Sequence, residues 1–210
     1  MIRKTIYFTL ILAGILFTVS CADKTDKSTA KKEEKQETVK KDSFEAEKAD
    51  YLKKGMTIAK SSGKTLKGKL TAAVDKGGLK NGINTCNKIA QKLMDSLSTT
   101  YGVKIKRTSL KLRNPKDKPD QEELAMLVQY SKTVENGTKP KPQVKKLSTG
   151  DVRFYAPIMI DKVCLNCHGK IGENIRAENY EAIKKHYPND EAIDYKEGDL
   201  RGIWSITFKK

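Results

Sequence analysis

Apolar residues recur along the chain at spacings that separate helical segments from strands. Leu66, Leu70 and Val74 stand four residues apart, which predicts a helix that ends at Gly77-Gly78. A second helix is predicted over 79–100, because five apolar residues there lie three or four positions apart. These five residues are Ile83, Cys86, Ala90, Leu93 and Leu97. They fall on a single helix face.

Strand patterns dominate the rest of the chain. Alternation of apolar and polar residues predicts strands over 103–110, 144–147, 152–160 and 202–208. Thr149-Gly150-Asp151 indicates a hairpin between the second and third of these strands. Asp120, with Glu123 three residues later, predicts a capped helix that runs to about Val134, and a further helix is expected over 174–186. The layout is one α+β domain, with N-terminal helices followed by an antiparallel sheet and intervening helices.

The first fifty residues have a different character. A basic start and a short apolar run are typical of a secretory signal peptide, here over residues 1–20. Cys21 follows directly, which favours a lipoprotein-type signal with acyl chains on Cys21, a plain signal peptide being the alternative. Residues 21–50 are almost wholly polar and predict a flexible charged tether that could turn helical near 43–58. We therefore expect an exported, periplasmic protein that is lipid-anchored to a bacterial membrane, with its domain over 51–210.

The domain carries most of the positive charge. The chain has 42 Lys and Arg against 26 Asp and Glu, a formal net charge of +16 at pH 7, and the tether holds nearly equal numbers of both signs. For an exported protein this excess points to an acidic partner, an anionic cofactor or lipid headgroups, and not to nucleic acid. The mean hydropathy of -0.63 excludes an integral multi-span membrane protein.

The segment Cys164-Leu165-Asn166-Cys167-His168 has the C-x-x-C-H spacing that attaches a c-type haem. The two thiols would form thioethers with the vinyl groups of one porphyrin, and His168 would offer a ring nitrogen to the iron. A thioredoxin-like dithiol, a local disulfide, and a zinc site that adds Cys86 or His186 are the alternatives. No second paired-ligand motif is present, so the spacing favours one covalent haem.

Residue types alone leave several candidates for the second axial ligand. His and Met are the common partners of a motif histidine in cytochromes c, which favours His186 or a methionine. The methionine candidates are Met94, Met126 and Met159. Cys86 could equally be an ordinary buried cysteine on an apolar helix face, and an open sixth position is a further alternative.

Six stretches carry a family resemblance. In chain order they are Asn84-Thr85-Cys86, residues 107–115, 155–158, 164–169, 187–192 and 198–205. Over about residues 50–208 the sequence resembles a family of monohaem c-type cytochromes with a PAS-like fold, long catalogued as a domain of unknown function. The resemblance implies a PAS-like antiparallel sheet with flanking helices. It also implies that His168 and Cys86 are the two axial ligands of the iron.

A Cys/His-ligated haem suggests two functions. A thiolate ligand stabilises ferric iron and lowers the reduction potential. Arg107 and Arg113 flank the matched loop and are candidates to pair with the haem propionates, ordinary surface arginines being the alternative. We expect a membrane-tethered electron-transfer protein with an acidic redox partner, because no output domain follows Lys210; a haem-based redox or diatomic-gas sensor is the alternative. No acid/base constellation stands out, so an enzyme is not expected.

Overall fold

The computed structural model describes residues 27–210, with side chains from Phe44 onward. The chain divides into two units between Lys41 and Asp42, and the second unit, Asp42–Lys210, holds the sheet and the predicted haem motif. The predicted signal peptide over 1–20 and the lipidation site at Cys21 lie outside the described residues. Among the helices that are described, none is long and apolar enough to cross a membrane.

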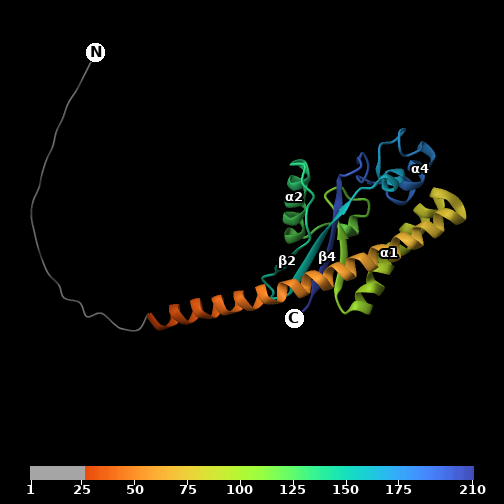
Figure 1. Cartoon of the computed structure of the whole chain (residues 1–210). Coiled ribbons are helices and arrows are strands. Elements are labelled where there is room, and N and C mark those ends of the chain that lie inside the picture. The colour runs from red at the N-terminus through yellow and green to blue at the C-terminus, as the bar shows by residue number, and fades with distance from the viewer. Residues whose placement is uncertain (1–26) are drawn as a thin grey trace, which may run out of the picture. The chain divides into compact units, whose positions relative to one another are not determined.

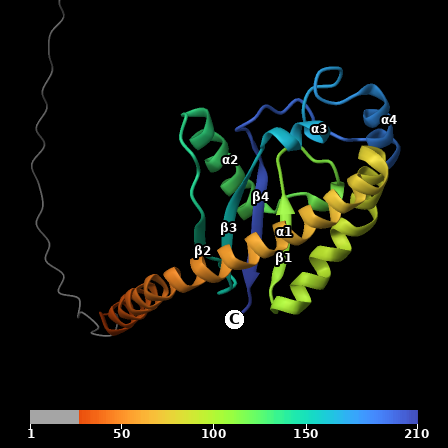
Figure 2. The same ribbon diagram turned by 45° about the vertical axis from the view of Figure 1, so that its right-hand side comes forward.

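Helix α1 runs from Lys27 to Tyr101 and is interrupted at Gly77 and Gly78. Gly78 has a φ of 71°, a left-handed conformation that glycine adopts without steric cost. The chain reverses at this point, so that a first arm (residues 42–76) and a second arm (residues 79–101) lie side by side (Figure 2). The Tyr101 hydroxyl donates to Ser61 Oγ at 2.9 Å and links the two arms. The predicted helix end at Gly77-Gly78 is confirmed.

The backbone is helical from Lys27 onward, so the helix begins earlier in the predicted tether than the expected turn to helix near 43–58. Lys, Glu, Gln and Ala have high intrinsic helix propensities, and they make up much of this segment. A segment that is too polar to build a core can therefore still form a helix. The low hydrophobicity of this segment predicts that its side chains are not buried in a core, but it does not predict whether its backbone is helical.

Four antiparallel strands form one sheet in the order β1-β4-β3-β2; Figure 1 shows the sheet within the whole chain, and Figure 2 labels all four strands. Their bounds are Lys104–Thr108 for β1, Gln143–Lys146 for β2, Val152–Met159 for β3 and Leu200–Phe208 for β4. The expected hairpin joins β2 to β3 and pairs Val144 with Phe154. All four strands lie within two residues of their predicted bounds, and the α+β class is confirmed.

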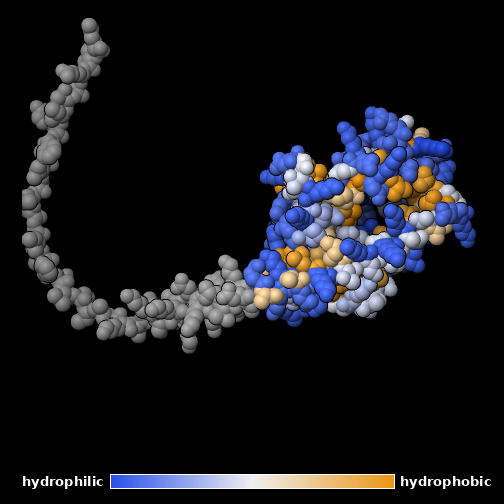
Figure 3. All heavy atoms as spheres, viewed as in Figure 1, coloured by the Kyte–Doolittle hydropathy of each residue, from blue (hydrophilic) through white to orange (hydrophobic). Residues whose placement is uncertain are grey.

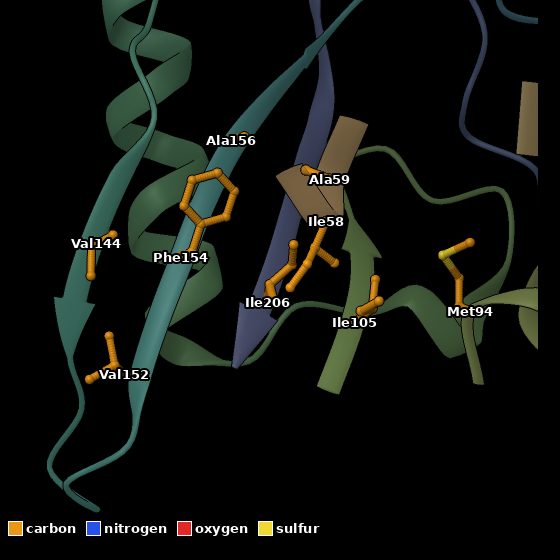
Figure 4. Packing of buried hydrophobic residues seen from close by; sticks show 9 residues of the cluster. All are labelled: Ile58, Ala59, Met94, Ile105, Val144, Val152, Phe154, Ala156 and Ile206. Atoms are coloured by element: carbon orange, nitrogen blue, oxygen red, sulfur yellow. The ribbon is translucent and has the colours of Figure 1, made fainter. Parts of the chain in front are cut away.

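Helices cover both faces of the sheet. The face that carries Phe154 and Ile206 packs against α1 in the cluster shown in Figure 4. The opposite face carries Tyr155 and Ile203 and packs against α2, Gln121–Glu135. These residues alternate along β3 and β4, as expected for strands that are buried on both sides.

The predicted capping box at the start of α2 is confirmed, because Asp120 Oδ1 accepts from the Glu123 amide and Glu123 Oε2 accepts from the Asp120 amide, both at 2.9 Å.

The remaining elements lie around one end of the sheet. Helix α4 falls inside its predicted range. The bounds of the other elements are Pro115–Asp117 for η1, Lys162–Cys164 for η2, Leu165–His168 for α3 and Ala177–His186 for α4.

Gly55 marks a close approach of the first arm to the sheet. A Cβ at this position would lie 2.2 Å from Cγ of Phe154, which is fully buried. Gly68 lies on the same arm, and a Cβ there would meet nothing within 4 Å. The absence of a side chain at Gly55 therefore sets how closely α1 can pack on β3.

These two glycines give a matched pair of substitutions. Gly55→Ala is expected to lower the free energy of unfolding by about 1–3 kcal/mol, because the added methyl group overpacks the core against Phe154. Gly68→Ala is expected to raise it by about 1 kcal/mol, since alanine is the better helix former. Urea unfolding followed by circular dichroism measures both. Effects of the same sign would contradict the close approach at Gly55.

Candidate functional site

The C-x-x-C-H motif occupies two short helical turns directly after β3. Asp161 begins the first turn, where its Oδ1 accepts from the amides of Val163 and Cys164 at 3.1 and 3.2 Å. The turn continues through η2 into α3, which ends at His168. The Cys164 thiol donates to the same Asp161 oxygen at 3.0 Å. One carboxylate thus fixes the start of the motif.

The thiols of the motif are not joined to each other. Cys86, Cys164 and Cys167 are all free, so the disulfide interpretation finds no support. Within residues 44–210, no group of three His, Cys, Asp or Glu side chains converges as it would to hold a metal ion directly. The zinc interpretation therefore lacks a ligand set in this part of the chain.

His168 is held in one orientation by a backbone carbonyl. Its Nδ1 lies 2.8 Å from the carbonyl oxygen of Ala192, so Nδ1–H is the donor and Nε2 keeps its lone pair. Tyr195 packs edge-on against the ring, at 6.2 Å between centroids. Burial, together with Arg113 and Arg201, lowers the pKa of His168 well below its usual range. The imidazole is therefore neutral and suited to binding a metal.

Arg113 connects the motif to the segment that follows α4. Its Nε and Nη2 donate to the two carboxylate oxygens of Asp190 at 3.1 and 3.0 Å. Nη2 also donates to the carbonyl oxygens of Cys167 and Ala192, at 2.6 and 3.1 Å. Asp190 has no exposed side-chain surface, and 15 % of the Arg113 side chain is exposed. The predicted propionate partner Arg113 is thus already bound to protein groups.

Two further arginines retain buried nitrogens without partners. Nε of Arg107 and Nε of Arg201 are buried, and neither N–H donates a hydrogen bond to an acceptor among the described residues. Arg201 uses Nη1 to donate to Ser109 Oγ at 2.7 Å, and Arg107 stacks 5.9 Å from the centroid of the Trp204 ring. Burial lowers the pKa of Arg201, and the charges of Arg113 and Arg107 lower it further. The three guanidinium groups therefore share one positive region.

Cys86 lies on the second arm of α1 and faces the same region. Burial raises the pKa of the Cys86 thiol, while Arg107 and Arg113 act in the opposite direction. Burial raises the pKa of Cys167 most, and Arg113 lowers it. A negative charge on Cys86 raises the pKa of Cys167 further. The thiol of Cys86 is therefore close enough to the motif to interact with it electrostatically.

The alternative axial ligands have other surroundings. Met94 packs in the cluster between α1 and the sheet, and Met126 is buried on the opposite face of the sheet. His186 lines a cavity of about 330 Å³ together with Asn87, Tyr187 and Arg113. Met159 is half-buried at the end of β3. Cys86 interacts electrostatically with Arg107 and Arg113 and also with Cys167 of the motif, whereas His186 adjoins this region through the cavity that it lines with Arg113.

The site has the chemistry that a haem requires. Apolar walls are present, because Ile83, Ile175 and Ile183 are buried in a cluster that includes Cys167. Figure 3 shows hydrophobic residues gathered around a hollow in the half of the domain that carries α4. The unpartnered nitrogens of Arg107 and Arg201 fit the two carboxylates of a haem. The residues present thus match both the apolar ring and the anionic edge of that group.

Arg201, Asp190 and Ala192 are the site residues that sequence reasoning missed. All three lie in stretches that carry the family resemblance, 187–192 and 198–205, yet none belongs to a recognisable motif. A buried carboxylate bound to an arginine 77 positions away gives no local pattern in a sequence. The resemblance marked the segments and left their roles unassigned.

Comparisons with known proteins agree on one relationship. The Tll0287-like family model matches residues 22–209. Among solved structures, the crystal structure of the cyanobacterial heme-protein Tll0287 is similar, with a TM-score of 0.54 and 20 % identity over 74 % of this chain and 94 % of that chain. At this identity the likeness concerns the fold. No curated protein matches the chain.

Removing Arg113 should expose the cost of an unpaired buried charge. Arg113→Ala is expected to lower the free energy of unfolding by about 3–5 kcal/mol, because Asp190 stays buried without its partner. Adding Asp190→Asn to that variant should recover part of the loss. Urea unfolding measures both effects. As a control, Arg176→Ala removes an exposed ion pair with Glu178 and should cost less than about 1 kcal/mol. An Arg113→Ala loss as small as this control would contradict the role of the pair.

Proposed function

The chain belongs to the Tll0287-like family, and from that premise we propose that it binds one haem, attached covalently through thioethers of Cys164 and Cys167. A haem bound at this site would supply a one-electron iron couple. The observation that carries the proposal is the orientation of His168 inside the motif. Its Nδ1–H is used by the Ala192 carbonyl, and Nε2 remains available as the iron ligand.

Cys86 is our proposed second axial ligand. Its position among the arginines near His168 supports this, as does its lack of a disulfide partner among the described residues. A thiolate ligand donates charge to iron and stabilises the ferric state, which lowers the reduction potential. Arg107 and Arg113 offset part of the negative charge on Cys86 and so favour its thiolate form.

We assign the propionate contacts to Arg107 and Arg201. Both present a buried Nε without a partner among the described residues, and a carboxylate is the natural acceptor for a guanidinium fork. Arg113 takes a different part: it holds the carbonyls of Cys167 and Ala192, and through Ala192 it orients His168. These residues therefore bind and orient, and we propose no catalytic reaction.

The function that this arrangement supports best is one-electron transfer at low potential. Cys86 and His168 would together occupy both protein-facing positions of the iron, which would suit a carrier. The signal peptide and Cys21 suggest an exported protein held at a membrane by lipid, and the basic domain suits an acidic redox partner.

A haem-based sensor of redox state or of a diatomic gas is the second candidate. The cavity of about 330 Å³ that includes Asn87 supports it, because Asn87 adjoins Cys86 in the sequence. A small ligand could approach the Cys86 side of the site through this space. Carbon monoxide binding to the reduced protein distinguishes the two functions. A protein that does not bind carbon monoxide is expected of a carrier, and a protein that binds it readily is expected of a sensor.

Covalent attachment can be measured directly. The protein exported from cells with haem c maturation machinery should retain a Soret band after denaturation, with one haem per chain in the pyridine haemochrome assay. Cys164→Ala combined with Cys167→Ala should abolish this covalent haem, whereas Cys86→Ala should preserve it. A protein without a Soret band would contradict the proposal, and a dithiol or a zinc site would then be the remaining interpretations of the motif.

The axial role of Cys86 needs a separate experiment. Cys86→Ala is expected to change the ferric absorption spectrum and to raise the midpoint potential, because the thiolate donor is lost. His186→Ala and Met159→Leu should leave both unchanged. If Cys86→Ala had no effect and one of these controls did, the ligand assignment would move to that residue.

A further inference from the structure

A second cavity, of about 370 Å³, lies between the first arm of α1 and the sheet. None of the cysteines, histidines or arginines of the haem site lines it. Its size is at the lower end of the range for small-molecule sites in proteins. It is referred to below as the α1 groove.

The helix contributes two rows of side chains to the α1 groove. Ala59 and Gly63 are four residues apart and form the inner row, where their small size leaves space above the sheet. A Cβ on Gly63 would lie 3.5 Å from Cζ2 of Trp204, in ordinary contact with the ring. A larger side chain at Gly63 would therefore fill the groove.

The outer row gives the groove a polarity. Met56, Lys60 and Lys64 follow one another at four-residue spacing, with the apolar side chain at one end and both cations toward the other. The row extends about 12 Å along the helix axis, given a rise of about 1.5 Å per residue. The α1 groove is thus elongated, apolar at one end and positive at the other.

The opposite wall is apolar. It is formed by Trp204 of β4 together with Ala156 and Pro157 of β3. No acidic residue lines the groove. Lys60 and Lys64 are exposed, and neither forms an ion pair with a side chain in the described part of the domain. Within the described residues, Lys60 and Lys64 therefore have no anionic partner beside the apolar wall.

We propose that the α1 groove binds a linear aliphatic carboxylate. The aliphatic chain lies beside Gly63 along the apolar wall of Trp204 and Ala156, and the carboxylate pairs with Lys60 and Lys64. Charge complementarity selects the anionic head, and the apolar inner row and wall select the chain. This site is additional to haem binding, and Trp204 adjoins both, because Arg107 stacks on its ring.

Trp204 offers a direct probe of binding. It is the single tryptophan of the chain, so its indole N–H gives one resonance in a ¹H–¹⁵N spectrum. Dodecanoate, kept below its critical micelle concentration, would be titrated into the full-length protein with its haem reduced. Calorimetry should detect binding, and the Trp204 resonance should shift with the same affinity.

Two pairs of variants locate the site. Gly63→Leu fills the groove and should weaken dodecanoate binding at least about tenfold, whereas Gly68→Leu makes the same change in open space and should not. Lys60→Glu with Lys64→Glu reverses the charge at the head and should weaken binding about tenfold. Lys88→Glu with Lys92→Glu is the control, because these two exposed lysines have the same spacing on α1 outside the groove.

Four results would overturn the proposal. The first is that dodecanoate does not bind, whether or not the protein binds anionic phospholipid vesicles. The second is that Gly63→Leu and the unaltered protein bind dodecanoate with equal affinity, and the third is that the protein binds dodecyltrimethylammonium as tightly as dodecanoate. The fourth is a shifted Soret band in Gly63→Leu. The last result would show that the groove belongs to the haem site. If Gly63→Leu fails to fold, the two lysine variants decide the outcome alone.

Discussion

The buried ion pair between Arg113 and Asp190 holds the motif site together. Asp190 is completely buried, and both of its carboxylate oxygens are used by Arg113. The same guanidinium binds the carbonyls of Cys167 and Ala192. Because Ala192 also accepts from His168, one arginine fixes both the backbone of the motif and the orientation of its imidazole. Three segments distant in sequence thus depend on a single charge pair.

That pair neutralises only part of the local positive charge. Arg107 and Arg201 remain beside the motif, each with a buried nitrogen that has no partner in the described domain. Desolvated guanidinium groups are costly unless an anion meets them. The site therefore suits a ligand with acidic groups at one edge and an apolar body near Cys167 and the isoleucines around it. This match connects the basic composition of the domain to its proposed cofactor.

Three glycines of α1 determine where this helix reverses and how closely it packs on the sheet. At Gly78 the chain reverses, and the second arm carries Cys86 toward the motif. At Gly55 the first arm comes close enough to exclude a side chain above Phe154. At Gly63 the same arm lies farther from the sheet, where an added Cβ would make only ordinary contact with Trp204 at the edge of the α1 groove. The packing distance between α1 and the sheet thus changes along the helix, closed over the core and open at the α1 groove.

Local patterns in the sequence determined the strands, the capped helix at Asp120, the helix end at Gly77-Gly78 and the C-x-x-C-H motif, because each depends on residues that are neighbours in the chain. The helix over 27–50 did not follow from polarity, since polarity governs burial more than backbone conformation. Only the tertiary structure decided that Arg113 binds Asp190 and Cys167, and that Arg201 joins Arg107 beside His168. These contacts join residues more than thirty positions apart, where no periodicity operates. Their partners are chosen by the path of the folded chain and by the cost of leaving a buried charge alone.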